Sequence, residues 1–178
     1  TESESESESE SAFERRRGGW RHAGYHLHVR LSVIIPTWCE AAAIEAQVAH
    51  ARSVGDEVIV ADGGSPDGTA EAAAQAGANV VPAPKGRGRQ LRAGAAVATG
   101  DVLLFLHADT TLAEGARAAI ERSVADPAVV GGNFLLRFDP PDLWARVFDT
   151  ANDLRRRALA IYYGDSAIFV RRSVYDAI

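Results

Sequence analysis

The sequence predicts one α/β domain on a doubly wound, mostly parallel sheet, which is a Rossmann-like arrangement. Short β-branched runs alternate with alanine-rich stretches of helical character, and the connections between them are short. Three of the apolar runs also end in polar or acidic residues, at Thr37, Asp62 and Asp109. Ligands of open α/β sheets bind at the carboxyl ends of the strands, so these residues predict a polar site at one edge of the sheet.

The strands are expected where runs of Val, Ile and Leu are bounded by Gly, Pro or Asp. The expected strands are Leu31–Pro36, Glu57–Ala61, Asn79–Val81, Val102–Leu106, Val129–Phe138 and Ala167–Val170. Helices are expected between them, several with a glycine stop. The expected helices are Glu40–Arg52, Asp67–Ala76, Arg89–Ala98, Ala113–Ala125, Leu143–Leu159 and one that begins at Arg172. Gly131 and Gly132 are expected to break the fifth strand.

The chain divides into two parts at residue 31. Residues 1–30 are expected to be a disordered or irregular extension, because the opening Glu-Ser repeat cannot build a core. Its basic and aromatic second half fits either a poorly ordered leader, which we favour, or a contact with acidic lipid or a partner. Residues 31–178 are expected to form the domain.

Composition excludes several functional classes. The net charge is −5, and five glutamates lie in the opening repeat, so the remainder is neutral and nothing predicts nucleic-acid binding. Cys39 is the only cysteine, which excludes an internal disulfide, suits a reducing compartment and predicts a small packing residue. No apolar run approaches the roughly 20 residues of a membrane span, and no signal peptide is visible. We expect a cytoplasmic protein, with a peripheral contact at the inner membrane face as the alternative.

The first candidate site residues follow the first two strands. Thr37 and Glu40 come after the first, although Glu40 alone also fits an acid in a first helical turn. Asp62 ends the second strand, and Gly63 and Gly64 would let a ligand approach the backbone closely. The alternative for Asp62 is ordinary turn chemistry, and Asp67 fits a helix start.

A basic, glycine-rich loop follows the third strand. Lys85, Arg87, Arg89 and Arg92 gather around two glycines there. The loop could reach a diphosphate, helped by the following helix N-terminus, or it could simply be solvated. As a dinucleotide fingerprint its glycine pattern is weak.

The remaining candidates lie after the fourth strand and before the last. His107, Ala108 and Asp109 follow the fourth strand, and a carboxylate there can hold Mg²⁺ or Mn²⁺ that bridges phosphates. We favour His107 as a neighbour of the metal rather than a ligand. Asp165 fits a general base or a turn aspartate about equally.

Together these residues resemble the family 2 glycosyltransferases. The matching segments are residues 31–37, 60–65 with 67–69, 94–101 and 106–110. The resemblance implies the GT-A fold, a nucleoside diphosphate sugar donor, an acceptor hydroxyl, a divalent cation and inversion at the anomeric carbon. It implies Asp165 as catalytic base and Asp109 as metal ligand. It also implies the following nucleotide-sugar contacts: Pro36, Thr37, Glu40, Asp62, Gly63, Gly64, Lys85, Arg89, His107 and Ala108.

A finer resemblance is to the arsenosugar-biosynthesis-type bacterial glycosyltransferases, through the Gly-Arg-Gly-Arg-Gln loop, the His-Ala-Asp segment and the residues around Asp165. His107 stands where the family has the first acid of its metal motif, and the chain stops where the family continues into acceptor-side structure. Two alternatives stay open: a non-catalytic nucleotide-sugar-binding module, and a sugar-phosphate nucleotidyltransferase. The second ranks lower because its basic loop would follow the first strand.

Overall fold

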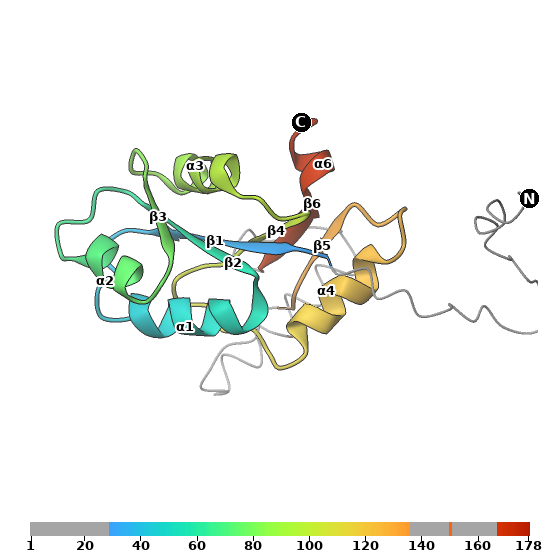
Figure 1. Ribbon diagram of the computed structural model, residues 1–178, viewed down its shortest axis with the longest axis horizontal. Coiled ribbons are helices and arrows are strands. Elements are labelled where there is room, and N and C mark those ends of the chain that lie inside the picture. Colours follow the sequence, from blue (N-terminus) through green and yellow to red (C-terminus); the bar gives the residue numbers. More distant parts are fainter. Residues whose placement is uncertain (1–28, 136–149, 151–166) are drawn as a thin grey trace, which may run out of the picture.

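The computed structural model describes residues 29–135, 150 and 167–178. Its core is a six-stranded sheet in the order β3-β2-β1-β4-β6-β5, shown edge-on in Figure 1. The four strands from β3 to β4 are parallel, whereas β6 runs antiparallel to both of its neighbours. The predicted mostly parallel α/β sheet is therefore confirmed.

The strands lie close to their expected positions. Their bounds are β1 Leu31–Thr37, β2 Glu57–Asp62, β3 Asn79–Pro82, β4 Val102–Phe105, β5 Gly131–Asn133 and β6 Ile168–Arg171. Because β1, β2 and β4 are parallel neighbours, their carboxyl ends share one edge of the sheet. The antiparallel β6 begins at that same edge, where Ile168 pairs with Phe105.

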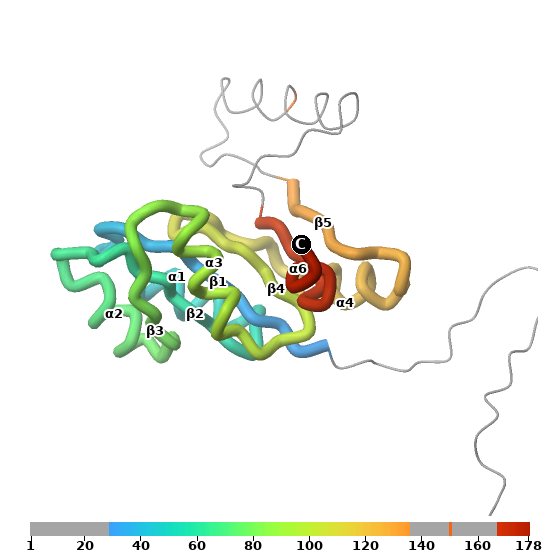
Figure 2. Tube along the Cα trace, turned by 90° about the horizontal axis from the view of Figure 1, so that it is seen from above, coloured from blue at the N-terminus to red at the C-terminus, as the bar shows by residue number. Residues whose placement is uncertain are grey.

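Helices cover both faces of the sheet. Their bounds are α1 Ile44–Val54, α2 Thr69–Gln75, α3 Arg87–Val97, α4 Ala116–Val124 and α6 Arg172–Tyr175. Figure 1 shows α1, α2 and α4 on one face and α3 and α6 on the other. Seen from above in Figure 2, β3 and α2 lie at one end of the molecule and β5 at the other. Within the described ranges, no helix is long and apolar enough to cross a membrane.

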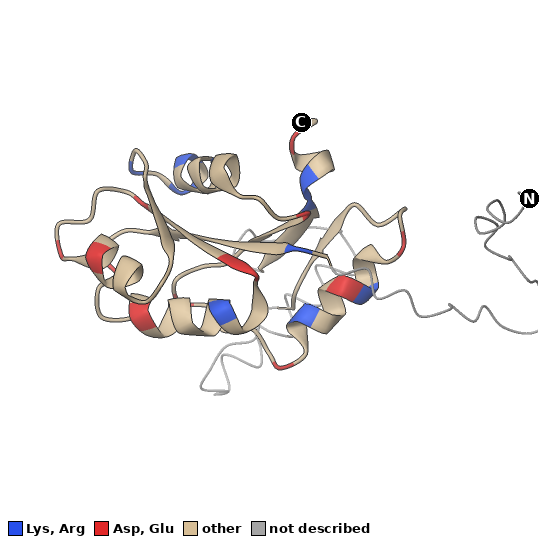
Figure 3. Ribbon diagram, in the orientation of Figure 1, with Lys and Arg blue, Asp and Glu red and all other residues tan. Residues whose placement is uncertain are grey.

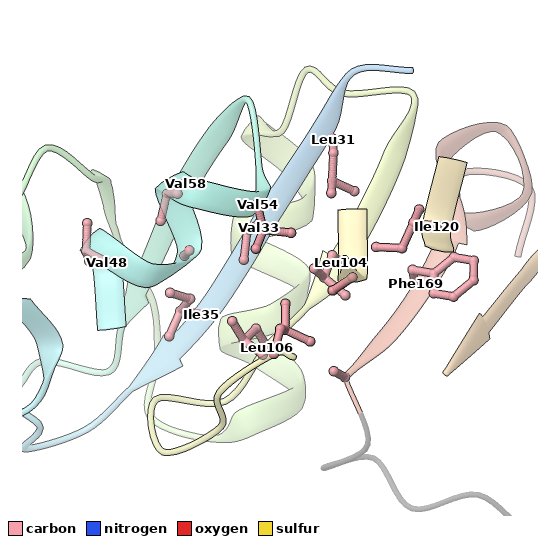
Figure 4. Packing of buried hydrophobic residues seen from close by; sticks show 14 of the residues in the cluster. Leu31, Val33, Ile35, Val48, Val54, Val58, Leu104, Leu106, Ile120 and Phe169 are labelled. Atoms are coloured by element: carbon pink, nitrogen blue, oxygen red, sulfur yellow. The ribbon is translucent and has the colours of Figure 1, made fainter. Parts of the chain in front are cut away.

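Successive side chains of β1 point to opposite faces of the sheet, so this strand contributes to both hydrophobic clusters of the core. Val33 and Ile35 point into the larger cluster under α1, α2 and α4, which Figure 4 shows, whereas Ile34 packs with Ala95 of α3 on the other face. All three β1 side chains are completely buried. Each stabilises the fold by roughly 1.5–3 kcal/mol relative to exposure. The strand that carries the candidate site residue Thr37 is thus held from both sides.

Four helices begin at other residues than the sequence predicts. Helix α2 begins at Thr69, two residues after the expected Asp67. Helix α1 begins at Ile44 rather than Glu40, because the preceding loop bonds to a neighbouring loop instead of continuing the helix. Helix α3 begins at Arg87, so the second glycine of the basic loop lies inside the helix. Helix α4 begins only at Ala116, since Gly115 has a left-handed φ of 81°.

The prediction for the fifth strand was wrong in its detail. Gly131 and Gly132 do not break a strand but form most of β5, where they pair with Val170 and Phe169. A side chain at Gly131 would lie 2.4 Å from the Phe169 carbonyl oxygen, so the glycines permit a close approach to β6. The expected helix over Leu143–Leu159 lies outside the described residues except for Thr150, which is helical.

Candidate active site

The candidate site begins where β1 and β2 end side by side. Thr37 and Asp62 are paired in the sheet register, and the Thr37 hydroxyl donates a hydrogen bond of 3.2 Å to Asp62 Oδ1. The same oxygen accepts a bond of 2.6 Å from the Ser65 hydroxyl. Asp62 Oδ2 accepts the backbone amides of Gly64 and Ser65, each at 2.8 Å. Asp62 therefore organises the loop after β2.

The hydrogen bonds of Asp62 also set its charge state. Burial raises the pKa of the Asp62 carboxyl, but the hydrogen bonds from the Ser65 hydroxyl and amide, the Gly64 amide and the Thr37 hydroxyl outweigh burial. The pKa of Asp62 consequently lies below its ordinary value of 3.8. A fixed negative charge sits at the end of β2 at neutral pH.

Side chains of the β2–α2 loop hold the loop after β1. Three successive backbone amides, those of residues 39–41, donate in turn to the Ser65 hydroxyl at 2.9 Å, the Thr69 hydroxyl at 2.9 Å and Asp67 Oδ2 at 3.2 Å. Hydrogen bonds from Thr69 and from the Ala41 amide hold the pKa of Asp67 below its ordinary value, although desolvation opposes them. Asp67 is therefore more than a helix start, because it joins two loops.

The hydrogen bonds between these two loops determine which polar groups remain available to bind a ligand. The amides of residues 39–41 are already used by protein acceptors, so they do not form a phosphate cradle. Glu40 is half-buried at the start of this loop, and in the described part of the chain no hydrogen bond or ion pair of its carboxylate is found. The prediction for Cys39 was wrong: it is exposed, with a positive φ of 57°.

Gln90, which the sequence analysis did not single out, joins a third loop to the site. Its buried side-chain amide donates to the Thr37 carbonyl at 2.6 Å and to the Ala61 carbonyl at 3.0 Å. Its oxygen accepts the Gly86 amide at 3.2 Å. A sequence signal was available, because Gln90 lies four residues before Gly94 on the inner face of α3, where an unpaired amide would be costly.

The basic loop between β3 and α3 lines a shallow, open cavity of about 570 Å³, whose lining residues are all exposed. Its walls are Lys85, Gly86, Arg87, Gly88, Arg89 and Arg92. Figure 3 shows positive charges gathered at this loop and at the start of α3. Within the described ranges, none of these four cations forms an ion pair, and the first turn of α3 carries no acid. The positive end of the helix dipole adds to their field, so the cavity suits an anion.

Asp109 follows β4. In the sheet, β4 lies on the opposite side of β1 from β2 and β3, and therefore from the basic loop that follows β3. Its exposed carboxylate has a weak contact of 3.4 Å with the Thr110 hydroxyl. The backbone around it is held by Gln47 of α1, which donates to the His107 and Thr110 carbonyls at 2.7 and 2.8 Å. Asp109 thus offers an available carboxylate on a fixed backbone.

The described residues contain no group of three or more His, Cys, Asp or Glu side chains that could hold a metal ion by itself. This fits a Mg²⁺ or Mn²⁺ ion bound with a nucleotide, because such ions commonly use one or two carboxylates together with substrate phosphates. Asp109 was predicted as the ligand of such an ion, and that assignment remains a prediction.

Asp165 lies outside the described residues. Among the described residues, Ala167 and the start of β6 follow Asp165 most closely. Ile168 pairs there with Phe105 at the end of β4, so the chain enters β6 at the candidate site's edge of the sheet. Ala167 is buried and has a positive φ of 46°, which fixes the direction in which the chain enters.

Comparison with known proteins identifies the family. Residues 32–178 match the model of glycosyl transferase family 2, and the chain belongs to this family. The comparison with curated protein sequences found no match.

Solved structures share the GT-A fold. Glucosyl-3-phosphoglycerate synthase from Mycobacterium tuberculosis, in complex with UDP, aligns with a TM-score of 0.58 and 22% identity over 90% of this chain and 64% of that chain. The same enzyme in complex with Mn²⁺, UDP-glucose and phosphoglyceric acid aligns with a TM-score of 0.57, 22% identity and coverages of 89% and 64%.

Mannosyl-3-phosphoglycerate synthase from Rubrobacter xylanophilus aligns with a TM-score of 0.57 and 19% identity over 85% of this chain and 56% of that chain. The chain therefore spans less than two thirds of the length of these enzymes. At such identities the likeness shows the fold.

Proposed function

We propose that the protein transfers a sugar from a nucleoside diphosphate sugar to an acceptor hydroxyl, with inversion at the anomeric carbon and assistance from a divalent metal. The observation that carries this proposal is the edge at which three adjacent parallel strands end: Thr37 and Asp62 are paired there at the ends of β1 and β2, Asp109 follows the end of β4, and the basic loop follows β3. Membership of glycosyl transferase family 2 supports it.

The nucleoside is assigned to the ends of β1 and β2. Glu40 supplies a carboxylate that can accept a base or ribose donor. The carboxylate of Asp62 accepts four hydrogen bonds from the protein, so its main role is to shape the loop of Gly63 and Gly64. Pro36 and Thr37 form the floor of this subsite, because they pair with Ala61 and Asp62.

The diphosphate is assigned to the space between the cationic cavity and Asp109. Negative charge develops on the diphosphate as the sugar leaves, and Lys85 and Arg89 can offset part of it. His107 and Ala108 lie directly before Asp109 and would border the phosphates. A bound Mg²⁺ or Mn²⁺ would supply further charge neutralisation at Asp109.

The acceptor side is assigned to the entry of β6. Asp165 precedes this entry by three residues, and β6 starts beside the end of β4. An ionised carboxylate there can take the proton of the acceptor hydroxyl as the new C–O bond forms. Attack from the face opposite the leaving diphosphate gives inversion.

A non-catalytic nucleotide-sugar-binding module is the second candidate. The donor-side features, the pair of Thr37 and Asp62 and the basic loop, would serve this function as well as they would serve the enzyme. The nucleotidyltransferase alternative is disfavoured because the cationic cavity follows β3 rather than β1.

The finer assignment to the arsenosugar-biosynthesis type is also a proposal. The Gly-Arg-Gly-Arg-Gln loop supports it, since its glutamine is the Gln90 that ties this loop to β1 and β2.

A thermal-shift titration tests the proposed function. UDP and other nucleoside diphosphates are added with and without Mn²⁺, and UDP release from UDP-glucose is followed with a panel of acceptors that includes 3-phosphoglycerate. A ligand that binds only the folded state raises the melting temperature. Binding with turnover supports the enzyme, binding without turnover supports the module, and no binding of any nucleotide contradicts both.

A further inference from the structure

Trp38 and Lys85 contact each other next to the candidate site residue Gly63, although they come from different loops. Trp38 follows β1, Lys85 follows β3, and the Lys85 ammonium lies 3.5 Å from the centre of the Trp38 ring. An ammonium over an indole face is attracted by the ring's negative face, and tryptophan gives the strongest such contact. Lys85 is the only lysine among the 19 Lys and Arg residues of the sequence.

The backbone segments that carry Trp38 and Lys85 are held next to each other by a buried side chain. Gln90 holds the residues next to both partners. Its side-chain NH₂ donates to the carbonyl of Thr37, which precedes Trp38, and its side-chain oxygen accepts the backbone amide of Gly86, which follows Lys85. A side chain at Gly63 would lie 3.3 Å from the Trp38 ring and 3.4 Å from Lys85 Cα, so both residues pack over that glycine.

We propose that Trp38 is a positioning residue that holds the Lys85 ammonium ready for the diphosphate of the donor. This inference rests on the proposed function, because it assigns the anion of the cationic cavity to that diphosphate. A free lysine side chain loses rotamer freedom when it binds phosphate, and a lysine that is already held by an indole loses less. The ammonium keeps its N–H donors for phosphate oxygens, since the ring contact uses only one side of it.

The arginines of the cavity differ from Lys85 in this respect. In the part of the chain that the structure describes, Arg87, Arg89 and Arg92 have no aromatic or acidic partner. The cavity therefore combines three cations without a fixed partner with one that is held in place. Removal of the indole should weaken anion binding only through Lys85.

The first experiment tests the contact without a ligand. When the protein is labelled with ¹³C-lysine, its NMR spectrum contains one set of lysine side-chain signals, because Lys85 is the only lysine in the sequence. The ε-methylene protons should lie upfield of those of free lysine through the ring current. They should return to the free position in Trp38→Leu and stay upfield in Trp38→Phe. A free position in the wild type overturns the proposal.

The second experiment measures coupling to an anion. Inorganic pyrophosphate is the probe, because it has no base and cannot report a contact between the indole and a nucleoside. Trp38→Leu should weaken pyrophosphate binding about two- to fivefold, as expected for losing an exposed cation–π contact. Trp38→Phe should recover most of the affinity, and Trp38→Leu should cause no further loss in a Lys85→Met background. Equal losses with and without Lys85 overturn the proposal.

The two proposals fail in different ways. If the wild type binds neither UDP nor pyrophosphate, the proposed function fails, and the assignment of Lys85 to a diphosphate fails with it. If the wild type binds both probes and the two substitutions are additive, the positioning role alone fails. Unchanged melting temperatures of Trp38→Leu and Trp38→Phe exclude unfolding as the cause of a loss.

Discussion

The Thr37 hydroxyl donates to the Asp62 carboxylate across the paired last residues of β1 and β2, at 3.2 Å. Two residues that are 25 positions apart in the chain thereby form one polar corner. The loop after β2 and the loop after β1 are both built from this corner. Substitutions of Asp62 and of the nearby candidate site residues should show which side chains stabilise the fold and which bind a ligand.

Asp62→Asn should destabilise the fold. An asparagine has one acceptor oxygen. If that oxygen takes the place of Oδ2 and keeps the Gly64 and Ser65 amides, the side-chain NH₂ faces the Thr37 and Ser65 hydroxyls that now donate to Oδ1. The expected loss at pH 7 is about 1–3 kcal/mol of unfolding free energy, measured by urea denaturation. Asp109→Asn is the control, with an expected change within about 0.5 kcal/mol, because Asp109 is exposed. Equal stability of Asp62→Asn and the wild type would contradict the structural role.

The effect of Asp62 should depend on pH. Its pKa in the folded state lies below the ordinary 3.8, so its ionised form stabilises folding. This stabilisation is complete above the ordinary pKa and is lost as the pH falls through the lowered folded-state value. The stability difference between wild type and Asp62→Asn should therefore shrink between pH 5 and the acid limit of folding. A difference that is constant over this range would show that ionisation is not the cause.

Glu40→Gln should weaken nucleotide binding without loosening the loop. The loop is held through the Glu40 backbone amide, which the substitution leaves intact. The loss of a carboxylate acceptor should lower UDP affinity about tenfold, measured by isothermal titration calorimetry. Glu45→Gln on the neighbouring helix α1 is the matched control and should bind UDP as the wild type does. Unchanged UDP affinity in Glu40→Gln would remove Glu40 from the site.

Asp109→Asn should remove the part of UDP affinity that depends on metal. The amide keeps the size of the carboxylate but is a much poorer ligand for Mg²⁺ or Mn²⁺. UDP affinity measured with Mn²⁺ and with EDTA should differ in the wild type and become similar in the variant. If EDTA has no effect on the wild type, the phosphates are neutralised by the cationic cavity alone.

Asp165→Asn should abolish turnover while UDP binding stays near the wild-type level. The substitution keeps the shape of the side chain but removes the base that the acceptor hydroxyl requires. UDP release from UDP-glucose, with an acceptor that supports turnover, should fall by about 10²–10⁴-fold. Near-normal turnover would return Asp165 to the role of a turn residue.

Two glycines of α3 should respond in opposite ways to alanine. A methyl group at Gly94 would lie 2.5 Å from Ile34 Cγ2 in the core, so Gly94→Ala should cost about 1–3 kcal/mol. A methyl group at Gly88 meets nothing within 4 Å, so Gly88→Ala should be neutral or stabilise the helix by about 0.5 kcal/mol. Urea denaturation of both variants checks the pair, and a costly Gly88→Ala would show that α3 does not begin at Arg87.

Much of the sheet follows from local patterns. The strands through Leu31, Val58 and Val102 are apolar runs bounded by turn residues, and their order along the chain with helices between them requires parallel pairing. Helix starts were predicted less well. Ile44 begins α1 because side chains 26 to 29 positions away satisfy the preceding amides, and no local signal contains that information.

The sequence by itself determined the α/β class, the positions of every strand except β5 and the presence of acids at strand ends, because these depend on residues adjacent in the chain. Only the tertiary structure decided that Asp62 holds a loop, that Gln90 ties the basic loop to the ends of β1 and β2 and that Lys85 lies on Trp38. These contacts join residues from separate strand–helix units, up to 53 positions apart, and several donors could have satisfied each acceptor. Packing of α3 on β1 and β2 selects one set of partners, and that selection shapes the candidate site.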